Sequence, residues 1–97
     1  MHVEPLTDRL RRELHVAKDV KGVLVARVDN GSAAESGGIS DGDIVVAINQ
    51  APVATPQEAA AKLNEAAHSA KKSALLLLNR HGVTEYVGVN LDGHNQG

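Results

Sequence analysis

The sequence contains no cysteine, no phenylalanine and no tryptophan, and Tyr86 is its only aromatic residue. The absence of cysteine excludes disulfide bonds and thiolate chemistry, and it is compatible with an oxidising or a reducing compartment. Proteins that bind single-stranded nucleic acid stack the bases on aromatic side chains. In addition, a net charge of −2 with both signs interspersed offers no phosphate-binding face. We therefore expect no nucleic-acid partner.

Long apolar runs are also missing. The longest, Ala74–Leu78, has the length of one strand, whereas a membrane-spanning helix needs about 20 apolar residues. The sequence shows no signal peptide, and we expect no insertion into a membrane. The 97 residues, 42% of them hydrophobic, suffice for one domain with an aliphatic core. We place that domain at residues 1–91, followed by a polar tail at residues 92–97.

The middle of the chain has the most regular pattern. Two short runs rich in β-branched residues, Val23–Val28 and Ile44–Ile48, predict strands. Between them, Ser32 is placed to cap a helical turn over residues 33–36. The pair Gly37-Gly38 would end that turn, because one of these residues must adopt a left-handed conformation there.

Two further segments predict helices. Thr7 is placed as the N-cap of Asp8–Leu14, in which leucines recur every four residues on one face. The tetrapeptide Thr55-Pro56-Gln57-Glu58 is a capping box with proline at the first helical position. It predicts a helix over Pro56–Ser69.

The two ends of the domain predict strands. His2–Glu4 precedes Pro5, which lacks the N–H needed to continue a ladder. Near the C-terminus, Ser73–Leu78 and Val83–Leu91 predict a hairpin with a turn at residues 79–82, since apolar and polar residues alternate in the second of these segments.

No arrangement of residues favours catalysis, a metal or a cofactor. Ser36-Gly37-Gly38 has the order found around a serine-protease nucleophile, but no Gly-Asp precedes it, and the glycines already serve as a helix stop. Asp41-x-Asp43 could begin a calcium loop, but the glycine and the distal glutamate are misplaced, which favours a turn. The spacing between the histidines is not that of metal ligands. The histidines are His2, His15, His68, His81 and His94.

The central pattern resembles a PDZ domain, in which a strand is followed by G-S-x-A-x-x-A-G-φ and x-x-G-D-φ-φ-x-φ-N. Two residues depart from it: Gly37 stands where the family often has alanine, and Ala34 where it often has proline or alanine. The resemblance implies an α+β, PDZ-like fold. We expect a partly closed five- to six-stranded antiparallel barrel or sandwich, flanked by two helices.

Residues 1–28, M-H-V-E-P-L-T-D-R-L-R-R-E-L-H-V-A-K-D-V-K-G-V-L-V-A-R-V, resemble the circularly permuted PDZ domains of bacterial HtrA (Do-like, DegP-type) serine proteases. The P-L-T-x-x-L-R segment is typical of their second, C-terminal PDZ domain. In that alignment Met1 is the last apolar residue of the loop that binds a ligand's terminal carboxylate, and the Leu-Gly of this loop lies upstream of Met1.

The resemblance also implies a ligand site. PDZ domains add a peptide as a strand to a sheet edge beside a helix, here the segment Met1–Glu4 and the helix from Pro56. The small side chain of Ala60 would leave room for a bulky apolar ligand side chain, although alanine is also simply a good helix former. The implied peptide-binding residues are Met1, His2, Val3, Glu4, Pro56, Ala60, Leu63 and Asn64.

By this resemblance the chain is a monomeric, non-catalytic, periplasmic module. It would bind C-termini or extended segments of unfolded proteins, and its other partners would be the protease domain and the other PDZ domain of its parent. One alternative is an assembly contact between subunits with the peptide site unused. The helix bearing Arg9-x-Arg11-Arg12 could serve as that contact, although a solvated charged face explains it better. Another alternative is a different parent: an intramembrane metalloprotease, a tail-specific protease or a secretion component.

Overall fold

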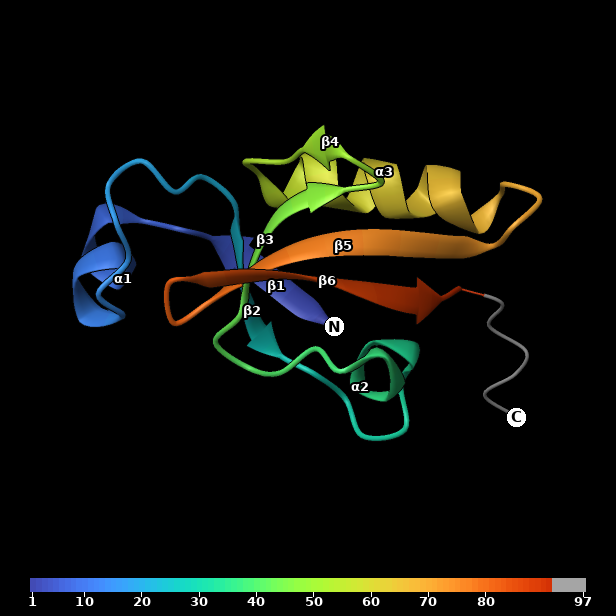
Figure 1. Ribbon diagram of the computed structural model, residues 1–97, viewed down its shortest axis with the longest axis horizontal. Helices are drawn as coiled ribbons and strands as arrows, with labels where there is room; N and C mark the ends of the chain where they lie inside the picture. The colour runs from blue at the N-terminus through green and yellow to red at the C-terminus, as the bar shows by residue number, and fades with distance from the viewer. Residues whose placement is uncertain (92–97) are drawn as a thin grey trace.

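The computed structural model describes residues 1–91, so the expected polar tail, residues 92–97, lies outside the described residues. The described residues form six strands and three helices, which are labelled in Figure 1. In chain order they are β1 (His2–Pro5), α1 (Asp8–Glu13), β2 (Val23–Arg27), α2 (Ala33–Gly37), β3 (Ile44–Ile48), β4 (Ala51–Pro52), α3 (Pro56–Ala67), β5 (Ser73–Arg80) and β6 (Val83–Asn90).

The strands form one antiparallel sheet in the order β1-β2-β3-β5-β6, and the two-residue strand β4 pairs with β3. The expected α+β class is confirmed. The sheet does not close, because β1 and β6 lie at opposite ends of this order and do not pair with each other. The third helix is α2, the short helical turn that the sequence predicts.

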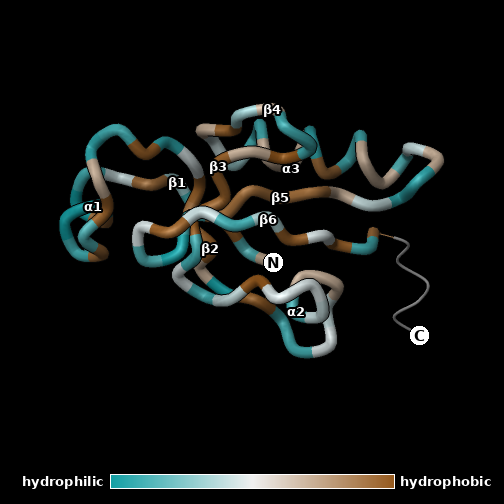
Figure 2. Tube along the Cα trace, in the orientation of Figure 1, coloured by the Kyte–Doolittle hydropathy of each residue, from teal (hydrophilic) through white to brown (hydrophobic). Residues whose placement is uncertain are grey.

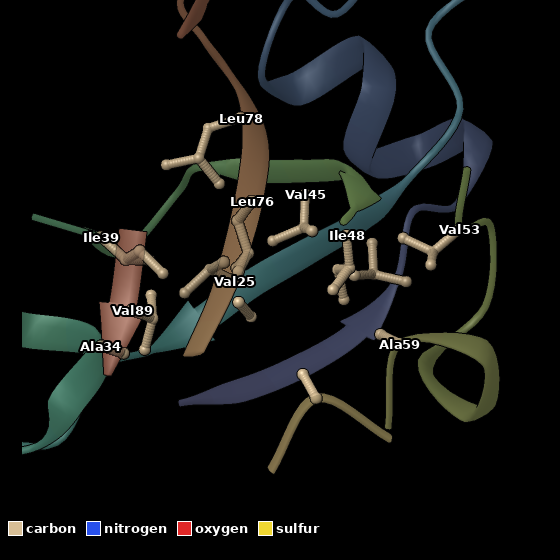
Figure 3. Packing of buried hydrophobic residues seen from close by; sticks show 13 residues of the cluster. Val25, Ala34, Ile39, Val45, Ile48, Val53, Ala59, Leu76, Leu78 and Val89 are labelled. Atoms are coloured by element: carbon tan, nitrogen blue, oxygen red, sulfur yellow. The ribbon is translucent and has the colours of Figure 1, made fainter. Parts of the chain in front are cut away.

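The core is aliphatic and lies on one face of the sheet. Helix α3 packs against β5 and β3, and α2 packs against β6. Figure 2 shows hydrophobic residues along β3 and β5, and Figure 3 shows the side chains of the core, with Ala34 of α2 beside Val89 of β6. The cluster comprises Val23, Val25, Ala34, Ile39, Val45, Ile48, Val53, Ala59, Ala66, Ala74, Leu76, Leu78 and Val89.

The predicted caps are formed. Thr55 and Glu58 make the reciprocal capping box at the start of α3, and the Ser32 hydroxyl accepts from the N–H of Glu35 in α2. Gly38, with φ of +96°, is the left-handed residue that ends α2, whereas Gly37 belongs to the last helical turn. None of the described helices has the length and hydrophobicity to cross a membrane.

Several element boundaries differ from the expected ones by one or two residues. Helix α3 ends at Ala67 instead of Ser69. The expected four-residue turn of the hairpin is a two-residue turn at His81-Gly82, because the two preceding residues still pair with β6 and both turn residues have positive φ. Pro5 is the last residue of β1. Proline is tolerated there because β1 is an edge strand of the sheet.

Candidate functional site

Strand β1 forms one edge of the sheet. It pairs with β2 in a register that joins Val3 to Val25 and Glu4 to Leu24, and no other described strand pairs with it. Helix α3 contacts β1 as well as β3 and β5. The outer side of β1 is therefore a sheet edge that lies beside a helix, which is the arrangement that strand addition requires.

Apolar side chains line the inner side of this edge. Met1 and Val3 are half-buried and pack against the core, and the residue opposite Val3 in β2, Val25, is fully buried. Leu63 of α3 packs against the same core from the helix. The structure thus brings Met1, Val3 and Leu63, which the sequence analysis places in the site, to one apolar layer.

The other helical residues of the predicted site share one flank of α3. Pro56, Ala60 and Asn64 are spaced by four residues, Pro56 is half-buried, and the other two are exposed. The opposite flank carries Lys62 and Glu65, which line a cavity of about 260 Å³ with residues of β3 and β4. The first flank therefore points away from β3 and β4, toward the side of α3 that lies next to β1.

The two polar residues of β1, His2 and Glu4, are exposed and lie on the face opposite Val3. His2 Nε2 lies 3.1 Å from Asp29 Oδ2 and 2.9 Å from a guanidinium nitrogen of Arg27. No sequence signal predicts this cluster. Arg27 and Asp29 are 25 and 27 residues from His2 along the chain, and only the pairing of β1 with β2 brings them together.

The other candidate sites of the sequence have structural roles. Ser36 is an exposed residue of α2. Asp41 Oδ1 accepts the backbone N–H of Val28 at 2.8 Å, as a turn residue would. Among residues 1–91, no three histidine, cysteine, aspartate or glutamate side chains are grouped so that they could hold a metal ion. His94 lies outside the described residues.

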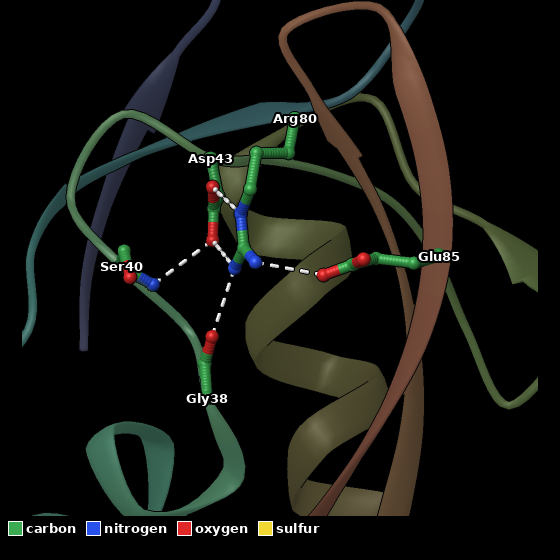
Figure 4. Close-up of polar contacts among 5 residues, drawn as sticks. All are labelled: Gly38, Ser40, Asp43, Arg80 and Glu85. Carbon is green, nitrogen blue, oxygen red and sulfur yellow. Dashed lines mark hydrogen bonds and ion pairs between the residues drawn. The ribbon is translucent and has the colours of Figure 1, made fainter.

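The strongest polar network surrounds a buried carboxylate, Asp43 (Figure 4). Arg80 donates to it twice, from Nε to Oδ1 at 2.8 Å and from a terminal nitrogen to Oδ2 at 2.6 Å. The Ser40 N–H donates to Oδ2 at 2.9 Å. The remaining donors of Arg80 reach the Gly38 carbonyl at 2.8 Å and Glu85 Oε1 at 2.7 Å. This network leaves neither side chain free for catalysis.

Burial alone would raise the pKa of Asp43. The hydrogen bonds from Arg80 and from the Ser40 N–H, together with the guanidinium charge, outweigh that effect, so the pKa of Asp43 lies below its ordinary value of 3.8. The carboxylate therefore stays ionised at neutral pH, paired with the guanidinium of Arg80.

Two of the larger cavities lie away from the β1–α3 edge. One, of about 500 Å³, is lined by the connector between α1 and β2, by the β5–β6 turn and by the Asp43–Arg80 pair. The other, of about 670 Å³, lies at the far end of the hairpin, between Asn49 and Asn90. The β1–α3 edge is thus distinguished by its open backbone and apolar layer.

Comparison with known families agrees with this geometry. The model of the family described as "PDZ domain" matches residues 10–78 of the chain. The chain belongs to the PDZ domain family. The match includes the central strands, the α2 turn and the whole of α3.

The curated relatives of this PDZ domain are named as probable periplasmic serine endoproteases, DegP-like. The protein from Chlamydia trachomatis is 29% identical over 93 residues, which cover 95% of this chain and 18% of that protein. The protein from Rhizobium meliloti is 31% identical, over 94% of this chain and 18% of that protein. These matches confirm the expected relationship to DegP-like proteases, and their names support the expected periplasmic location. The chain spans about a fifth of the length of these relatives.

Solved structures show the same fold. The PDZ domain of HtrA3, bound to a phage-derived ligand (FGRWV), is 27% identical with a TM-score of 0.73, and the match covers 93% of this chain and 80% of that one. The HtrA-type protease AlgW with a decapeptide is 20% identical with a TM-score of 0.76, and the match covers 92% of this chain and 26% of that one.

Replacing Arg80 by alanine should destabilise the PDZ domain by about 3 kcal/mol or more, because a buried carboxylate would lose its counter-ion. Urea unfolding followed by circular dichroism measures the loss. The control is Arg9→Ala, which breaks an exposed pair with Glu13 on α1 and should cost less than about 1 kcal/mol. Equal losses in the two variants would contradict a stabilising role of the Asp43 network.

The stability of the PDZ domain should fall in acid through Asp43. Because its pKa is lowered in the folded state, the unfolded chain binds the proton more tightly. The contribution is complete above the unfolded pKa of about 4 and is lost as the pH falls through the folded value. Urea unfolding between about pH 6 and pH 2.5 measures it. The Asp43→Asn variant should be less stable than the native domain near neutral pH, and the difference should shrink in acid. A constant difference would contradict the assignment.

Proposed function

We propose that this PDZ domain binds extended peptides, including free C-termini, by adding them as a strand to the outer edge of β1 beside α3. The observation that carries the proposal is the position of β1: it is an edge strand, it contacts α3, and its inner face is apolar. Backbone hydrogen bonds would supply much of the affinity, and side chains between Val3, Ala60 and Leu63 would supply the selectivity.

The ligand site comprises Met1–Glu4 on the strand side. On the helix side it comprises Pro56, Ala60, Leu63 and Asn64. Alternate ligand side chains would point toward the apolar layer, where the exposed methyl group of Ala60 leaves room for a large apolar side chain. Because strand addition provides few buried anchors, we expect affinities on the order of micromolar, about −8 kcal/mol.

The domain serves substrate recognition or regulation in an HtrA-type serine endopeptidase, as its C-terminal PDZ domain. Support comes from the DegP-like relatives, whose whole length is about five times that of the matched segment. The catalytic triad of such a protease would lie in a separate domain, so this chain alone would hydrolyse no substrate. Its partners would be C-termini or extended segments of unfolded proteins, together with the other domains of its parent.

The test is an NMR titration of the ¹⁵N-labelled domain with short peptides that end in free, apolar C-termini. Binding along β1 predicts shifts at residues 2–4 and 56–64. In the Ala60→Leu variant the leucine side chain would fill the space for the ligand, and the affinity should fall at least about tenfold. Ala61→Leu is the matched control, because Ala61 is also exposed but lies on the outer side of α3, and it should bind as the native domain does.

The same titration is repeated with Leu-Gly placed before Met1, the two residues that precede the last apolar residue of the family's carboxylate-binding loop. Tighter binding in that form would support capture of a free C-terminus. No shifts up to millimolar peptide in either form would overturn the proposal and favour an assembly contact between subunits instead.

A further inference from the structure

The outer face of β1 carries one carboxylate without a counter-charge. Glu4 is exposed and lies opposite Leu24, on the face of the sheet away from α3. Within residues 1–91 it makes no ion pair and its side chain makes no hydrogen bond. Its neighbour on the same strand face, His2, is already engaged by Asp29 and Arg27.

The charges of that neighbouring cluster compensate one another. Arg27 Nε lies 3.4 Å from Asp29 Oδ1, and both side chains contact the His2 ring. A ligand strand running past β1 would therefore meet a balanced group at His2 and an uncompensated negative charge at Glu4. The outer face of the edge should therefore favour a positively charged ligand residue at one position, the one opposite Glu4.

The register of an added strand determines which ligand residue meets Glu4. Every strand pair of the sheet is antiparallel, and we take an added strand to continue that pattern. If one ligand residue lies opposite Val3 and points toward the apolar layer, then the preceding ligand residue lies opposite Glu4 and points to the outer face. The two ligand positions are adjacent in sequence but contact opposite faces.

We propose that Glu4 is a specificity-determining residue that selects ligands with a lysine or arginine immediately before the apolar residue facing Val3. The inference rests on the proposed peptide site along β1. Directly opposed charges on neighbouring strands attract when they are opposite and repel when they are alike. The simpler alternative is that Glu4 only prevents the β1 edge from pairing with the sheet edge of another molecule, as charged residues on edge strands do.

The experiment compares two fluorescein-labelled peptides with free C-termini, Lys-Val-Lys-Val-Ala-Val and Glu-Val-Glu-Val-Ala-Val. A charged residue precedes each of the first two valines, so one lies opposite Glu4 whichever of these two valines faces Val3. Fluorescence anisotropy with the domain, in native form and with Leu-Gly before Met1, should give threefold to tenfold tighter binding of the lysine peptide at low salt. The preference should decrease as salt is added.

Three variants separate Glu4 from the overall charge. Glu4→Gln should reduce the preference to near unity, and Glu4→Lys should reverse it in favour of the glutamate peptide. Glu65→Lys changes the net charge by the same amount but lies on the flank of α3 that faces β3 and β4, so it should keep the native preference. Unchanged ¹⁵N spectra away from the substituted position verify that each variant is folded.

The outcomes distinguish this inference from the function on which it rests. If neither peptide binds any form of the domain, the proposed peptide site fails. If both peptides bind but the native domain does not discriminate between them, or if Glu65→Lys reverses the preference as Glu4→Lys does, the peptide site stands and the role of Glu4 is overturned.

Discussion

The pairing of Asp43 with Arg80 is the constraint on which the arrangement of the sheet depends. Asp43 precedes β3 and is almost fully buried, while Arg80 ends β5, 37 residues later. A carboxylate buried at that place is tolerated only if a cation and further donors surround it. The end of β5 must therefore lie beside the start of β3. Through Glu85 and the Gly38 carbonyl, the same guanidinium also links β6 and the end of α2 to this point.

Once these segments are joined, the open edge follows from the strand order. Strands β3 and β5 occupy the interior of the sheet, β6 is attached through its hairpin, and β1 can pair only with β2. Helix α3 covers the core through Ala59 and Ala66, whose small side chains allow close approach. The side of α3 next to β1 carries Ala60, whose small exposed side chain leaves space beside the edge.

Local patterns predict most of the elements, because capping and turn chemistry act within a few residues. The capping box at Thr55 and the N-cap at Ser32 are examples. The sequence does not predict which partners His2 and Asp43 find, since these contacts join residues 25 to 37 positions apart. The sequence does not predict strand β4, because two residues are too few to show the alternation of apolar and polar residues that marks a strand. The β1 edge is expected only through family resemblance, because a sequence pattern alone does not reveal which strand lacks a neighbour.

The lone aromatic residue has a practical consequence for spectroscopy. Tyr86 lies opposite Leu77 on the outer face of the hairpin and is 58% exposed, so it belongs to no packed core. Its fluorescence therefore changes little when the core forms. Because the chain contains no tryptophan, the domain emits almost no fluorescence when it is excited at wavelengths that only tryptophan absorbs. A ligand that carries one tryptophan would thus be the only strong emitter in a mixture, and its own fluorescence would report contact with the protein without any label.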